Sequence, residues 1–125
     1  MGYPFDFSER RKYPRVSITL PFEYRESDSS SPEGGLVSNL SEIGMFIYSI
    51  KDIPIGSEFK IVVFFSNGFE FDGFRVNAKA IWKDRHFETD WKGYKYGLQF
   101  LQIPEEDRWK LLNLLGSHIL FKGFL

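Results

Sequence analysis

The feature that most restricts the fold of this chain is a run near its start in which apolar and polar residues alternate. Every second position is apolar, in the series Val16, Ile18, Leu20, Phe22 and Tyr24. Because successive side chains of a strand point to opposite faces, this period of two predicts a β-strand with one buried face. Pro21 cannot donate a hydrogen bond to a neighbouring strand, so we expect a sheet edge or a bulge there.

Further strand and turn signals follow at short intervals. A polar loop at 26–35 and a turn at 39–44 separate extended segments at 36–38, 45–49, 59–65, 69–83 and 94–100. The dipeptide Asn67-Gly68 predicts a hairpin, since both residues tolerate positive φ, and Gly73 predicts a bulge in the long strand. Strands at this spacing, without crossover helices, favour a closed antiparallel barrel or a sandwich.

Near residue 104 the period changes to that of a helix. Pro104 precedes three acidic residues, a composition typical of a helix start. The predicted apolar face of this helix consists of Trp109, Leu112, Leu115 and Ile119. A chain of 125 residues can bury one core but not two. We therefore expect a flexible arm at 1–9, which shows no period, and one domain at 10–125.

Composition excludes several classes of function. The chain has no cysteine, which rules out disulfides and thiolate metal sites and is compatible with the cytoplasmic location that we expect. Its net charge of -1 provides no overall field that would attract DNA. No apolar run approaches the roughly 20 residues that span a bilayer. We expect neither DNA binding nor membrane insertion.

The histidines do not indicate catalysis. His86 and His118 are the two in the chain, and neither has a metal ligand or nucleophile partner at a recognisable spacing. A phosphate-binding glycine loop of the P-loop type is also missing from the sequence. We therefore expect no enzymatic activity, no metal site and no resident cofactor.

A cluster of cations precedes the first predicted strand. It comprises Arg10, Arg11, Lys12 and Arg15. The guanidinium group is planar and always charged, so it can bind phosphate oxygens with two donors and also stack on a base. Pro14 stiffens the backbone just before Arg15. Taken alone, this spacing is also typical of a solvated basic stretch at a chain terminus.

A second cluster lies in the predicted turn Asn39-Leu40-Ser41-Glu42-Ile43-Gly44. The amide of Asn39 offers a donor and an acceptor that can recognise a base edge. The hydroxyl of Ser41 can donate to a phosphate, and Gly44 permits positive φ or a close backbone approach. Taken alone, the segment is better explained as a polar turn in which Asn39 makes an Asx-type hydrogen bond.

Together the two clusters resemble the signature of the PilZ domain family. That signature is Arg-x-x-x-Arg on an N-terminal loop, followed by Asp/Asn-x-Ser-x-x-Gly. It matches R-K-Y-P-R at Arg11–Arg15 and N-L-S-E-I-G at Asn39–Gly44. The segments 76–83 and 94–100 resemble later barrel strands of the family, and the terminal helix resembles its closing helix. The resemblance covers residue 10 to about residue 115.

The resemblance implies an all-β fold, a six-stranded antiparallel β-barrel with a C-terminal α-helix, and binding of the bacterial second messenger cyclic di-GMP. In such a site Arg11 and Arg15 would bind the phosphates and guanines of the ligand. Asn39 would bond the Watson–Crick edge of a guanine. Ser41 would contact a phosphate or another ligand oxygen, and Gly44 would shape the turn.

Arg10 matches an additional arginine that, in some members of the family, accompanies binding of a stacked ligand pair. We expect the ligand to order residues 1–14 on the barrel, so that the chain acts as an adaptor for a protein partner in motility, exopolysaccharide or pilus machinery. Two alternatives stay open. One is a PilZ-like adaptor that binds protein without nucleotide, and the other is a barrel that binds single-stranded nucleic acid. No particular oligomeric state is predicted.

Overall fold

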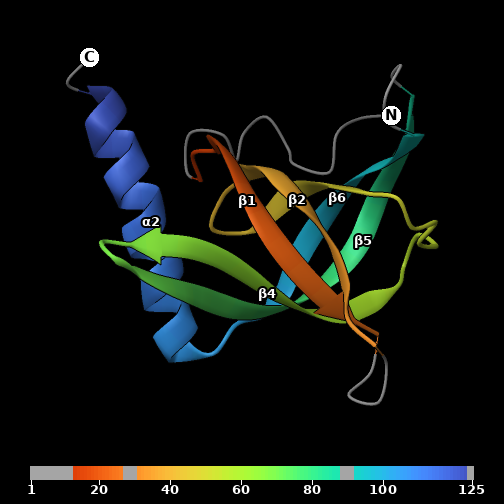
Figure 1. Ribbon diagram of the computed structural model, residues 1–125, viewed down its shortest axis with the longest axis horizontal. Coiled ribbons are helices and arrows are strands. Elements are labelled where there is room, and N and C mark those ends of the chain that lie inside the picture. The colour runs from red at the N-terminus through yellow and green to blue at the C-terminus, as the bar shows by residue number, and fades with distance from the viewer. Residues whose placement is uncertain (1–12, 27–30, 88–91, 124–125) are drawn as a thin grey trace.

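The computed structural model describes residues 13–26, 31–87 and 92–123, which form six strands and a helix (Figure 1). The elements are β1 (Val16–Arg25), β2 (Glu33–Leu40), β3 (Gly44–Ser49), β4 (Glu58–Asn67), β5 (Glu70–Phe87), β6 (Lys92–Gln102) and α2 (Glu105–Gly123). The strands close into a barrel in the order β1-β2-β3-β6-β5-β4, with antiparallel neighbours throughout. This confirms the predicted fold class. The arm expected at 1–9, Arg10 and Arg11 lie outside the described residues.

Strand β1 is not a sheet edge, because it pairs with β2 on one side and with β4 on the other. Of the two expectations for this strand, a sheet edge or a bulge, the bulge is observed: the register of β1 against β2 shifts between Ser17 and Leu20. Pairing with β4 begins only at Phe22. Pro21 therefore opposes no residue of β4, and its missing N–H leaves no gap in that ladder.

The barrel interior is filled by side chains from every strand, with one core for the whole domain. Residues at most 2% exposed include Phe22, Val37, Ile47, Val63, Phe74 and Leu98. Leu111 and Leu115 of α2 extend this core on the outside of the strand ring. Burial of each large apolar side chain stabilises the fold by about 1.5–3 kcal/mol.

The hairpin between β4 and β5 turns one residue later than predicted. Asn67 pairs with Glu70, so Gly68 and Phe69 are the two turn residues. Only Gly68 of these has positive φ, at 66°. A glycine at the first central position matches the twist of an antiparallel pair, as in a type II′ turn.

The bulge expected at Gly73 is not there. Gly73 pairs with Phe64 in an unbroken register along β4. The irregularities of β5 lie instead against β6, between Asn77 and Ala78 and between Ala80 and Trp82. They fall where β5 passes from the hairpin into the closed part of the barrel.

Helix α2 begins at Glu105, directly after Pro104 as predicted, and lies against the β4–β5 hairpin (Figure 1). The predicted apolar face is only partly correct. Leu115 is buried, but Leu111 and the carboxylate Asp107 accompany it, whereas Trp109 is 61% exposed. Apolar residues occur on both sides of this helix, so its period alone does not identify the packed side. In the described part of the chain, no helix is both long enough and apolar enough to cross a bilayer.

Candidate functional site

The turn between β2 and β3 is held together by the side chain of Ser41, which is 1% exposed. Its Oγ accepts hydrogen bonds from the N–H groups of Ile43 at 3.2 Å and Gly44 at 3.3 Å, and donates to the Gly44 carbonyl oxygen at 3.2 Å. The Ser41 N–H donates to the same oxygen at 2.9 Å. The hydroxyl thus has a structural role in the turn, and its contact with a ligand stays a prediction.

Gly44 is the first residue of β3 and is buried opposite Gln99 of β6. Among the described residues, positive φ occurs at Gly56 and Gly68 and not at Gly44. Of the two backbone roles expected for Gly44, positive φ is therefore not observed. Its carbonyl oxygen serves the turn by accepting both hydrogen bonds from Ser41.

A row of residues in register runs across the outer wall of the barrel on five neighbouring strands. In order around the barrel these are Ser17, Asn39, Phe46, Gly97 and Trp82. Gly97 has no side chain, so the rings of Phe46 and Trp82 meet across it, with centroids 5.7 Å apart at an interplanar angle of 65°. This edge-to-face geometry is favourable for aromatic pairs. We call Phe46 and Trp82 the aromatic platform.

Two cations lie over the Phe46 ring of this platform. The guanidinium carbon of Arg15 is 5.3 Å from the centroid of Phe46, and Lys95 Nζ is 5.0 Å from the same centroid and 5.7 Å from that of Tyr48. Arg15 reaches this position because it directly precedes β1, whose first residues pair with the end of β2. Each cation–π contact stabilises by roughly 0.5–1 kcal/mol at an exposed site. Positive charge therefore gathers beside Asn39.

Asn39 has an unsatisfied polar atom. Its Oδ1 is buried and accepts no hydrogen bond in the part of the chain that the structure describes. The Asx-type hydrogen bond that the sequence left open for this oxygen is thus not formed. An unpaired buried acceptor costs about 1–3 kcal/mol, and such groups are uncommon in folded proteins. An incoming ligand that donates a hydrogen bond would remove this cost.

Spacer residues of the two motifs, and not the predicted ligand contacts Arg15, Asn39, Ser41 and Gly44, line one cavity of about 410 Å³. Tyr13 of the arginine segment and Ile43 of the turn both line it, together with residues of β5, β6 and α2. Glu42, also in the lining, lies 3.9 Å from Arg108 of the helix. Gln99 of the lining is two residues from Gly97, so the cavity adjoins the aromatic platform along β6. The described parts of both clusters are therefore neighbours in space.

Sequence reasoning did not identify Phe46, Trp82 or Lys95 as part of the site. Phe46 belongs to an almost continuous apolar run, in which the outward positions do not stand out. Trp82 follows an irregularity in β5 that shifts its register against β6. Only strand pairing shows that Gly97 lies between the two rings.

Ionisable groups inside and at the end of the barrel have structural roles. Burial raises the pKa of Tyr24 to about 12 and also raises that of Tyr96. The Tyr96 hydroxyl donates to the Lys51 carbonyl at 2.6 Å and accepts from the Ile53 N–H at 2.7 Å, which ties the β3–β4 connection to β6. No group of three His, Asp or Glu side chains among the described residues could hold a metal ion.

The chain belongs to the PilZ domain family, whose model matches residues 9–117. Comparison with curated protein sequences gives no match. The fold is shared with the Bacillus subtilis inhibitor of motility MotI/DgrA, at a TM-score of 0.72 and 16% identity, covering 90% of this chain and 53% of that one. It is also shared with the PilZ domain of YcgR from Escherichia coli, solved with c-di-GMP. That match has a TM-score of 0.65 and 17% identity, and it covers 90% of this chain and 94% of that one.

The Borreliella burgdorferi PlzA protein, solved in complex with c-di-GMP, is similar at a TM-score of 0.59 and 18% identity, covering 90% of this chain and 55% of that one. The chain thus spans about half the length of the MotI/DgrA and PlzA chains. At these identities the likeness shows the fold alone.

Proposed function

We propose that this chain is a receptor for cyclic di-GMP, which binds on the outer wall of the barrel between the arginine segment and the turn at 39–44. The observation that carries the proposal is the buried, unpaired Oδ1 of Asn39 beside Arg15 and the aromatic platform. The Watson–Crick edge of guanine presents N–H donors that suit this oxygen. Membership of the PilZ domain family supports the same ligand.

The chemistry of the ligand matches the groups around Asn39. Cyclic di-GMP carries two phosphates, which suit guanidinium donors, and two guanines, whose faces can stack on a guanidinium or an aromatic ring. We assign phosphate and guanine contacts to Arg11 and Arg15, and a further phosphate contact to Lys95. Ser41 and Gly44 keep the turn in shape. Arg10 would help to bind the second molecule of a stacked ligand pair.

The magnitudes are compatible with a reversible receptor. Each charge-assisted hydrogen bond contributes about 1.5–3 kcal/mol, a cation–π contact about 0.5–2, and a paired base edge about 1–3. Association costs about 4–15 kcal/mol, to which the ordering of the N-terminal segment adds. The remaining free energy corresponds to a micromolar or somewhat lower Kd.

We further propose that ligand binding orders residues 1–14 and that this change signals to a partner protein of motility, exopolysaccharide or pilus machinery. The free energy for the change would come from contacts between the ligand and this segment. Amide hydrogen exchange across 1–14 should slow at saturating cyclic di-GMP. Exchange that is unchanged by the ligand would contradict the switch, though not the binding site.

Isothermal titration calorimetry with cyclic di-GMP tests the binding site. We expect Arg11→Ala and Arg15→Ala each to weaken binding by roughly 10- to 100-fold, because each removes charge-assisted hydrogen bonds. Arg25→Ala is the matched control, since Arg25 is exposed at the far end of β1. Arg10→Ala should lower the number of ligands bound.

Three outcomes would contradict the proposal. Binding that survives both arginine substitutions would refute the site. A folded wild-type chain that binds no cyclic di-GMP would favour the adaptor that works without nucleotide. Displacement of cyclic di-GMP by a random single-stranded RNA at low salt would favour the nucleic-acid-binding barrel.

A further inference from the structure

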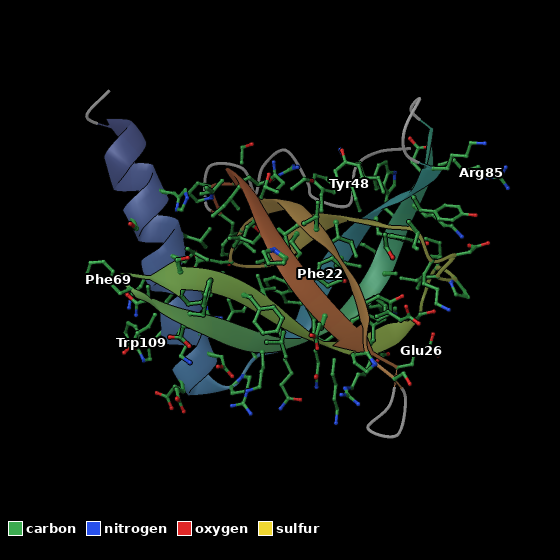
Figure 2. All side chains as sticks on the ribbon, in the orientation of Figure 1. Phe22, Glu26, Tyr48, Phe69, Arg85 and Trp109 are labelled. Atoms are coloured by element: carbon green, nitrogen blue, oxygen red, sulfur yellow. The ribbon has the colours of Figure 1, made fainter. Side chains whose placement is uncertain are left out.

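Aromatic side chains are exposed on the β4–β5 hairpin, away from the turn at 39–44. Phe69, at the hairpin tip in Figure 2, is fully exposed and Phe71 is 88% exposed. Monomeric proteins rarely expose large apolar side chains in groups, and such groups mark interaction sites. The hairpin protrudes from the closed barrel, because β1 pairs with β4 only as far as Val63 and β6 pairs with β5 only from Asn77.

The outer face of the hairpin is apolar beyond its tip. Alternation along β5 places Phe71, Gly73 and Arg75 on this face, and their pairing with β4 adds Phe64 and Val62. A side chain carbon at Gly73 would lie 3.2 Å from Val62 Cγ1 and 3.5 Å from Phe64 Cδ1. Both side chains therefore lie next to the glycine and form an apolar floor beside Phe71.

This floor continues into a cavity of about 540 Å³ with an excess of cations in its lining. Val62 belongs to both, and the charged residues that line the cavity are Arg25, Lys60, Arg75 and Glu23. Arg25 and Lys60 are direct partners on β1 and β4, so two positive charges stand side by side. Arg75 Nε also pairs with Asp107 Oδ2 of helix α2 at 3.1 Å, and this ion pair holds Arg75 at the edge of the cavity.

Helix α2 supports the hairpin from its other face. Lys110 Nζ lies 2.9 Å from Asp72 Oδ1 and donates to the Gly73 carbonyl at 3.2 Å. On the outer face Phe71 and Arg75 are exposed, whereas Val62 and Phe64 are half-buried. Trp109, next to Lys110 in the helix, is 61% exposed and lies on the same side of the molecule as Phe69 in Figure 2.

We propose that the outer face of the hairpin docks a protein segment in which apolar side chains are flanked by carboxylates. We call this face the hairpin surface and define it by Lys60, Val62, Phe64, Phe71 and Arg75. Aromatic and arginine side chains carry most of the energy at protein interfaces. Carboxylates of the partner would complement the cations of the cavity and select its orientation.

The five residues of the hairpin surface belong neither to the candidate nucleotide site nor to the lining of its 410 Å³ cavity, although that cavity and the 540 Å³ cavity share Gln102. The inference therefore names a surface for the partner of the proposed receptor, but it does not require nucleotide binding. Each proposal can fail without the other.

Selection from a random peptide library displayed on phage tests the hairpin surface, with the full chain as bait. Enriched peptides should combine Asp or Glu with apolar residues. A synthetic peptide of the enriched sequence should bind at least tenfold more weakly to Phe71→Ser and to Lys60→Glu. Ile50→Ser is the matched control, since Ile50 is 71% exposed and lies on the β3–β4 connection; it should leave peptide binding unchanged.

Calorimetry with cyclic di-GMP on Phe71→Ser should give the wild-type affinity, which separates failure of the hairpin surface from failure of the nucleotide site. A wild-type thermal melt would show that this exposed substitution preserves the fold. The proposal is overturned if no peptide is enriched, if enriched peptides lack carboxylates, or if Phe71→Ser binds them as well as wild type. If no peptide binds and sedimentation shows that the wild-type chain self-associates but Phe71→Ser does not, the surface would instead bind a second copy of this chain.

Discussion

Asn39 and Ser41 are two residues apart, yet their polar atoms are satisfied in different ways. The Ser41 hydroxyl takes part in three hydrogen bonds within its own turn. The Asn39 Oδ1 is buried without a partner among the described residues. If Asn39 binds the ligand as proposed, substitutions at Asn39 and at Ser41 should have opposite effects on stability.

For Asn39→Ala we expect weaker binding without a loss of stability. The affinity for cyclic di-GMP should fall by roughly 5- to 150-fold, corresponding to about 1–3 kcal/mol for a base-edge pair. The free energy of unfolding should stay the same or rise, because the substitution removes an unsatisfied acceptor. Calorimetry and urea denaturation of one preparation measure both quantities. Unchanged affinity together with lower stability would assign Asn39 a structural role.

For Ser41→Ala we expect a loss of stability. The substitution removes the acceptor shared by the Ile43 and Gly44 amides, and should lower the free energy of unfolding by about 1–3 kcal/mol. Ser66→Ala serves as the control, since Ser66 is exposed on β4 and should change stability by less than about 0.5 kcal/mol. Equal urea midpoints for the two variants would show that the turn does not depend on Ser41.

At the scale of elements, the β4–β5 hairpin depends on its turn and on helix α2. Its residues 64–76 have no β-ladder partner on β1 or β6. A two-stranded ribbon is marginally stable alone, so packing against a helix is needed. Leu111 and Leu115 supply that packing in the same cluster as Phe74. The bond to Lys110 lowers the pKa of Asp72, which favours the charged carboxylate at neutral pH.

Two glycine substitutions should change stability in opposite directions. Gly68→Ala places a side chain at a φ of 66° and should lower the free energy of unfolding by roughly 1 kcal/mol. Gly116→Ala should raise it by up to about 1 kcal/mol, because α2 favours alanine and no atom lies within 4 Å of the new carbon. Chemical denaturation measures both. The same sign for both variants would contradict the assigned turn or helix.

At the scale of the molecule, a single strand connects the two surfaces. Strand β5 carries Trp82 of the aromatic platform and Phe71 of the hairpin surface on one continuous element. Both residues point away from the core, so neither surface requires an opening of the barrel. A ligand that binds the folded chain alone should therefore stabilise the whole domain.

We expect cyclic di-GMP to raise the melting temperature. At a concentration of about 100 times Kd the stabilisation is about 2.7 kcal/mol, which corresponds to roughly 10 °C for a domain of this size. The variant with both Arg11→Ala and Arg15→Ala should show no shift, and GMP at the same concentration serves as the control for a nonspecific effect. A shift that persists in the double variant, measured by calorimetry, would contradict the proposed arginine contacts.

Local patterns were sufficient for the existence of the strands and for the start of the helix, but not for every strand boundary, since β2 (Glu33–Leu40) includes the end of the predicted loop at 26–35 and Asn39 of the predicted turn. The alternation from Val16 to Tyr24 needs no distant partner to indicate a buried face, and Pro104 with its acidic neighbours marks a helix start wherever the helix packs. The two motifs were also local, and they sufficed to recognise the family. The position of the arginine segment relative to the turn required the fold.

Properties that depend on neighbours from distant strands could not be predicted in this way. Phe46 and Trp82 meet only because both pair with Gly97, and the register of three strands brings this about. The same dependence explains the error for α2, where Trp109 and Leu111 are equally apolar and contact with β5 selects the buried one. The unpaired oxygen of Asn39 likewise could not be predicted from the sequence. Whether a buried acceptor finds a hydrogen-bond donor depends on the positions of all surrounding groups in the packed structure.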